Sequence, residues 1–165
     1  MVGVSVTVTG DQQLMDKLAK LGPALTNFGP AFAKIGGTLL DFYSDTVFNS
    51  QGGALAGAKG ISGGQGEGVP WAKLAPSTIA QKTKHYRQYA SVPLMATGAM
   101  RHSFYFDARS QSLEIGNSSD HFEFHQGDGD RTRLPRRPML GVNKTVLNLI
   151  KDGIETDIRE KVAAL

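Results

Sequence analysis

The chain has 165 residues, a length that fits a single core, and we expect one domain over residues 1–165. Its formal net charge of +3 falls well short of that of a dedicated nucleic-acid binder, and by itself it selects no partner. The chain contains no cysteine, which excludes disulfides, thiolate metal sites and cysteine nucleophiles, and it has no apolar run of the roughly 18 residues that a membrane span needs.

The first fifty residues predict a strand followed by two helices. Valines at positions 2, 4, 6 and 8 alternate with small or polar residues, which is the period of a strand with one buried face. Asp11 is placed to cap a short helix that carries leucines at 14, 18 and 21. A second helical pattern runs from Pro30 to Val47, and we expect it to be the main core helix. The first ten residues lack a basic start and a long apolar core, so we expect no signal peptide.

Residues 51–70 are predicted to form a long mobile loop. The stretch 51–68 holds eight glycines and few large apolar side chains, so burial cannot offset the entropy lost on ordering it. These glycines do not predict a phosphate-binding loop, because the pattern GxxxxGK[ST] is missing. Trp71 follows as an apolar anchor, and one or two helical turns are expected from Ser77 to Lys84.

The second half of the chain predicts a turn, three strands and a closing helix. Thr97 is placed to cap a short turn over 98–103. Alternating apolar residues predict strands at 104–107, 113–115 and 122–124, arranged as an antiparallel meander. A closing amphipathic helix is predicted from an apolar stripe at positions 147, 150, 154, 158, 162 and 165, with the charged pairs 151–155 and 155–159 opposite. The predicted fold is α+β, a small, mostly antiparallel sheet packed against two longer helices, with a long Gly-rich loop.

The closest pattern to a metal site is formed by His121, Glu123 and His125, which would share one face of a strand. The alternative is a polar face opposite Phe122 and Phe124. We favour the alternative, because nothing else in the sequence indicates the shaped pocket that a catalytic zinc site requires. We therefore expect no catalytic residue, no cofactor and no metal.

Four arginines lie within seven residues, at Arg131, Arg133, Arg136 and Arg137. Arginine suits both the phosphates of DNA and the carboxylates of an acidic protein partner. A solvated loop is equally consistent with the pattern. The cluster lacks the interleaved aromatic residues that are typical of single-strand DNA binders.

Four further elements follow one another in a fixed order. Phe48 to Gly52 ends a helix, and Trp71 to Leu74 lies before Lys82. Leu94 precedes the turn 97–103, and the elements 125–127 and 134–141 read HQG and LPRRPMLG. This order, over about residues 40–145, resembles the phage virion morphogenesis family, the tail-completion proteins of Mu-like and related tailed bacteriophages.

The resemblance implies a structural virion protein of a tailed phage and not an enzyme. It implies a protein that is made in the cytoplasm of the bacterial host and lies in the neck or tail of the virion. There it would form a homo-oligomeric ring, with a hexamer as the expected form, as a tail-completion, tail-terminator or head–tail connector protein. Its partners would be itself, the neighbouring neck and tail proteins and packaged DNA in passing, but no membrane.

The residues predicted to form the interface are Arg131, Arg133, Arg136, Arg137, His125 and Trp71. The first alternative function is that of a DNA-binding accessory protein that uses the cluster from Arg131 to Arg137. The second is a metal hydrolase built on the pair of histidines and Glu123. Salt dependence would separate DNA binding from the leading hypothesis, because phosphate contacts weaken steeply with salt.

Overall fold

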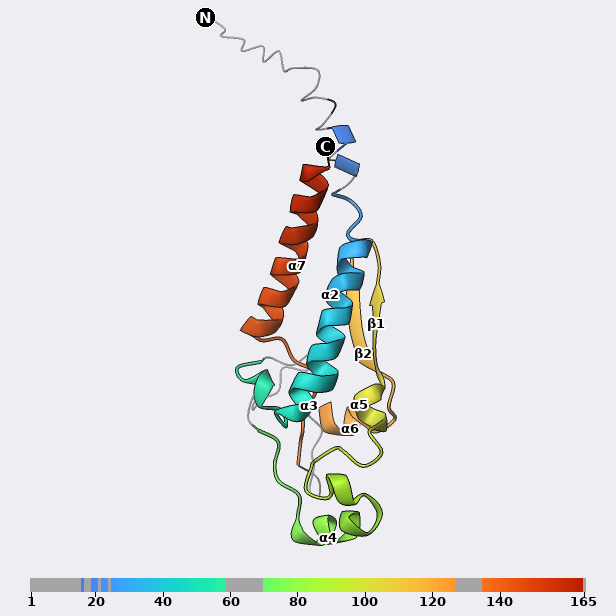
Figure 1. The fold of residues 1–165 in the computed structure, drawn as a ribbon, viewed down its shortest axis with the longest axis vertical. Coiled ribbons are helices and arrows are strands. Elements are labelled where there is room, and N and C mark those ends of the chain that lie inside the picture. Colours follow the sequence, from blue (N-terminus) through green and yellow to red (C-terminus); the bar gives the residue numbers. More distant parts are fainter. Residues whose placement is uncertain are drawn as a thin grey trace, which may run out of the picture.

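The computed structural model describes residues 16, 19–20, 22–23, 25–58, 70–126 and 135–164 (Figure 1). Helix α2 (Gly29–Asp41) packs against both the long helix α7 (Lys144–Ala163) and a two-stranded sheet. In the sheet, β1 (Phe104–Ala108) pairs antiparallel with β2 (Leu113–Asn117). The predicted α+β fold is therefore confirmed. The predicted strand at 2–8 lies outside the described residues.

The main core helix is present where the sequence predicts it. It has Pro30 in its first turn, where the missing N–H of proline costs no hydrogen bond. After Asp41 it continues as a π-helical turn (Phe42–Thr46) and then as α3 (Val47–Asn49). Its apolar positions form much of the core, and the buried ones include Ile35, Leu39, Phe42, Tyr43, Val47 and Phe48.

Gly36, in the middle of α2, allows the helix to approach the sheet closely. A Cβ atom at this position would lie 2.5 Å from Cδ2 of Phe106 on β1, closer than real side chains come. Glycine has a low helix propensity, but at position 36 it is the residue that lets the helix contact the strand. On the same side of the sheet, Phe104 is buried and stacks on Tyr43 with ring centroids 6.3 Å apart.

The prediction of a third strand at 122–124 is wrong, because these residues belong to a short helix, α6 (Phe122–Gln126). Phe122 packs against the core, whereas Phe124 is 58% exposed. Two phenylalanines separated by one residue fit a strand, but in a helix the same spacing places them on different sides. Three residues are too few to decide between the two periods.

Helix α7 begins at Asn143, whose Oδ1 accepts the N–H of Val146 at 3.1 Å. The predicted charged pairs are present, from Lys151 to Glu155 at 3.6 Å and from Arg159 to Glu155 at 3.7 Å. The predicted apolar stripe is only partly buried. Its central isoleucines are half-buried, but Leu147 and position 162 are exposed. The reason is that α7 packs mainly on α2, which covers a narrower strip than a sheet would.

The turns expected between the core helix and the sheet are also found. α4 (Pro76–His85) covers the predicted helical turns, and η3 (Arg87–Tyr89) follows it. α5 (Ala99–His102) forms at the predicted turn, where Thr97 Oγ1 accepts the N–H of Ala99 at 3.3 Å. None of the helices in the described ranges is long and apolar enough to cross a membrane.

The prediction of a mobile loop from residue 51 is wrong for its first part. Residues 53–55 form a 3-10 turn, η2 (Gly53–Leu55), and Leu55 and Ala58 are buried in the core. The glycines in this part allow tight turns rather than mobility, and the few apolar side chains are enough to anchor it. Residues 59–69 lie outside the described ranges.

Candidate functional site

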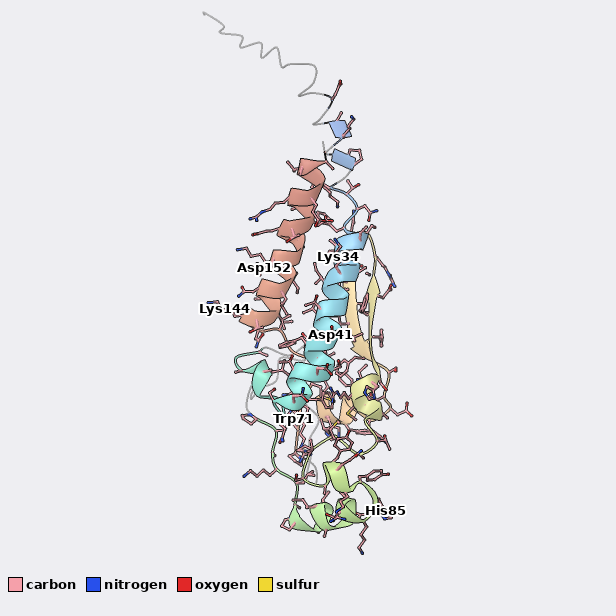
Figure 2. All side chains as sticks on the ribbon, viewed as in Figure 1. Lys34, Asp41, Trp71, His85, Lys144 and Asp152 are labelled. Carbon is pink, nitrogen blue, oxygen red and sulfur yellow. The ribbon has the colours of Figure 1, made fainter. Side chains whose placement is uncertain are left out.

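Trp71 lies beside the end of α3, where segments distant in the sequence meet (Figure 2). Its side chain is 4% exposed and packs edge-on against Phe48, with ring centroids 5.2 Å apart. The indole Nε1 donates to the carbonyl of Pro138 at 2.8 Å, and the backbone N–H of Trp71 donates to the carbonyl of Gln51 at 2.7 Å. Trp71 therefore joins the end of the core helix to the segment before α7.

Gly52 makes room for this indole. A Cβ atom on Gly52 would lie 2.4 Å from Nε1 of Trp71. The φ angle of Gly52 is +85°, a left-handed conformation that favours glycine. Both observations explain why the element 48–52 ends in glycine.

Gln126 holds the segment before α7 from the other side. Its Oε1 accepts the N–H groups of Met139 and Leu140, each at 2.9 Å, and its Nε2 donates to the carbonyl of Leu140 at 2.6 Å. The side chain is buried, and Met139 is fully buried beside it. A buried amide that forms three such bonds fixes the local backbone, because leaving any of these groups unpaired would be costly.

Arg137 is also buried, at 4% exposure, and it donates through Nε and Nη2 to the carbonyl of Ala72 at 3.1 and 2.9 Å. Burial lowers the pKa of Arg137. Its neighbour Arg136 donates through Nε and Nη2 to the carbonyl of Gln126 at 3.2 and 2.9 Å. Arg137, one of the four arginines predicted to form the interface, is therefore used inside the fold.

Asn143 and Lys82 hold two further segments. Besides capping α7, Asn143 donates through Nδ2 to the carbonyls of Ala54 and Ala56 at 2.9 and 3.2 Å. Lys82, on α4, donates through Nζ to the carbonyls of Val92 and Met95 at 2.6 and 2.5 Å. Burial and the nearby charge of Arg137 lower the pKa of Lys82. Both side chains therefore donate hydrogen bonds to loop carbonyls.

Tyr43 completes the set from the core helix. Its hydroxyl donates to the carbonyl of Gly141 at 2.8 Å, and its side chain is buried. Burial raises the pKa of Tyr43 to about 12, because the phenolate would lose its hydration. We call the six side chains that bind loop backbone in this way the clamp; they are Tyr43, Trp71, Lys82, Gln126, Arg137 and Asn143.

Tyr43 should make the stability of the fold fall at high pH. Its pKa is about 12 in the folded state and 10.0 as an ordinary tyrosine, so its contribution is complete below pH 10 and is lost as the pH rises through 12. We expect a loss of about 2 to 3 kcal/mol from this group. The measurement is urea unfolding across this pH range, with Tyr43→Phe as the control that cannot ionise. An equal loss in both proteins would contradict the assignment.

The histidine pattern does not form the predicted face. Glu123 and His125 lie on α6 and His121 precedes it, so residues two apart point in different directions. Within the described residues, no group of three or more His, Asp or Glu side chains could hold a metal ion. The shared strand face, on which the metal-hydrolase alternative rests, is therefore wrong.

The other predicted interface residues are placed as follows. Trp71 is buried in the core. The backbone carbonyl of His125 accepts the N–H of Arg137 at 3.2 Å. Arg131 and Arg133 lie outside the described residues. The sequence analysis did not identify the roles of Gln126 and Asn143. For Asn143 there was a signal, because it is a polar residue directly after the apolar run 139–142.

The clamp is a device for holding backbone in place. Within the described part of the chain, these six side chains form hydrogen bonds with backbone groups of the segments 52–56, 71–74, 92–95 and 138–146. Buried side chains whose polar groups are hydrogen-bonded in this way rigidify the backbone that they bind.

The chain matches the model of one protein family. The model of the phage virion morphogenesis family matches residues 9–159, a range that contains the whole clamp. No curated protein and no solved structure matches the chain. The match covers most of the 165 residues. The chain therefore belongs to the phage virion morphogenesis family.

Proposed function

We propose that this chain is a structural subunit that forms a ring, a hexamer in its expected form, at the head–tail neck or the upper end of a phage tail. Its partners are further copies of itself and the neighbouring neck and tail proteins. Family membership supports a role in virion assembly. The observation that carries the proposal is the clamp, because Trp71, Gln126 and Arg137, which lie in the family-like elements, bind the chain's own loop backbone.

The remaining contacts must then come from exposed side chains. Among the described residues, the large apolar side chains that are exposed are Tyr86, Tyr105, Phe124, Val142, Leu147 and Val162. Phe124 is the most exposed of them, at 58%. Aromatic side chains are common anchors of protein interfaces. We therefore place a subunit or partner contact at Phe124 on α6.

The DNA-binding alternative is weakened by the positions of two arginines. Arg136 and Arg137 donate to the carbonyls of Gln126 and Ala72, so neither guanidinium is a simple exposed charge. Arg131 and Arg133, the other two members of the cluster, lie outside the described residues. DNA binding through the cluster would weaken steeply as the salt concentration rises.

Replacing Phe124 with serine should block incorporation into particles without unfolding the chain. In the phage that encodes it, a tagged wild-type chain should appear at the neck or the upper end of the tail in electron micrographs. The Phe124→Ser chain should be missing from particles and should run as a monomer in light scattering. Its melting temperature should change by less than about 2 °C, because an exposed side chain contributes little to stability.

Phe122→Ser is the matched control on the same helix. Phe122 packs against the core and meets Phe104 edge-on, so its loss should cost about 2 to 3 kcal/mol of stability. A tag spread over the capsid or along the whole tail would contradict the proposed position. Normal incorporation of the Phe124→Ser chain would contradict the contact.

A further inference from the structure

Residues of α2, α7 and β2 together form a groove. In the ribbon, α7 and the sheet lie on opposite sides of α2 (Figure 1). It has a volume of about 450 Å³ and is lined by apolar side chains from all three elements, among them Phe32, Leu113, Ile115, Ile150 and Ile154. None of the described residues that line it is charged, and Leu113 and Ile115 are only half-buried. Open apolar surface of this kind favours a partner with an apolar face.

The groove is bordered by a strand edge. Among the described residues the sheet has two strands, so β2 has a described partner on one side only. The N–H of Arg109 donates to the carbonyl of Ser112, and the N–H of Ser118 donates to the carbonyl of Ser103. These two bonds determine which residues of β2 direct their backbone groups toward β1, because every second residue does so in an antiparallel pair. By this alternation, the backbone N–H and C=O groups of Leu113, Ile115 and Asn117 point away from β1. They are suited to pair with another strand.

The N-terminal sequence has the pattern that this groove requires. The valines at 2, 4, 6 and 8 would share one apolar face of a strand, and the opposite face would carry Ser5, Thr7 and Thr9. The uncharged valine face matches the uncharged lining of the groove. The polar face would continue the outer side of the sheet, where Glu114 and Tyr105 are exposed.

The chain can reach the groove. The N–H of Phe28, just before α2, donates to the carbonyl of Ser110 in the β1–β2 turn at 2.8 Å. This turn is next to the end of the groove that Gln111 and Ser112 line. Residues 16, 19–20 and 22–23 are helical and precede Phe28, so residues 9–15 connect the valine segment to this part of the chain. Seven extended residues span roughly 23 Å, which is enough to return a strand along β2 in the antiparallel direction. Attachment to the same chain also gives the segment a high effective concentration.

We propose that residues 2–8 add to the free edge of β2 as a third strand, with their valines in the groove of the same chain. This intramolecular strand completes the sheet and covers the apolar sides of α2 and α7. The proposal is independent of where the subunit lies in the virion.

The test compares two double variants of the full-length chain that carry the same added charge. Val4→Asp with Val6→Asp places carboxylates in the groove and should lower the melting temperature by about 5 to 10 °C and increase binding of a hydrophobic dye. Ser5→Asp with Thr7→Asp places them on the outer face and should change the melting temperature by less than about 2 °C. Equal effects of the two pairs would overturn the proposal.

A crosslink locates the segment directly and does not depend on stability. A photoreactive benzophenone side chain at position 6, on the valine face, should attach to peptides containing Ile115 or Ile150, in a product that runs at the mass of one chain. Attachment elsewhere would overturn the proposal. Attachment in a product of twice that mass would overturn the intramolecular strand, because the occupant would then come from a neighbouring copy.

Discussion

Replacing Trp71 with alanine is expected to destabilise the chain by about 3 to 5 kcal/mol, the usual cost of removing a large aromatic side chain from a packed core. Trp71 is buried against Phe48 and donates to the carbonyl of Pro138, so the variant loses packing and leaves that carbonyl unpaired. Urea unfolding followed by circular dichroism measures the loss.

The control Trp71→Phe separates these two contributions. It keeps an aromatic ring beside Phe48 but removes the Nε1 donor to Pro138, so it should cost about 1 to 2 kcal/mol. A loss of less than about 1 kcal/mol in Trp71→Ala would show that the clamp does not stabilise the fold in this way.

The variant Arg137→Glu, which reverses the charge, is expected to lower the free energy of unfolding by about 3 to 5 kcal/mol. A glutamate here would place a buried carboxylate against the carbonyl of Ala72, where the guanidinium now donates two hydrogen bonds. The measurement is again the free energy of unfolding in urea.

Lys73→Glu provides the matched control, because Lys73 is exposed and directly follows Ala72 in the sequence. Its stability should stay within about 0.5 kcal/mol of the wild type. If Arg137→Glu were as stable as Lys73→Glu, the buried arginine would have no structural role.

The elements that the sequence predicts well are those with a long, regular pattern. The core helix from Pro30 to Val47 repeats its apolar period over about five turns, which is long enough to identify a helix. Phe122 and Phe124 gave the wrong element, because two residues do not define a period. A hydrophobic pattern therefore predicts secondary structure more reliably when it extends over more residues.

The clamp could be predicted only in part, since its partners are distant in the sequence. Nothing near Gln126 indicates that Met139 and Leu140 will donate to its side chain. Arg137 looked like one of four surface charges, because composition does not show that the carbonyl of Ala72 lies beside it. The family-like elements located these residues but did not reveal what they bind.

The burial of Trp71 has a practical consequence for observing this protein. It is the only tryptophan among 165 residues, and it is placed where the core helix, the segment 70–74 and the segment before α7 meet. The tryptophan fluorescence of the chain therefore reports on that junction alone. A shift in its emission during assembly would reveal, without any label, whether binding a neighbour disturbs the clamp or leaves it intact.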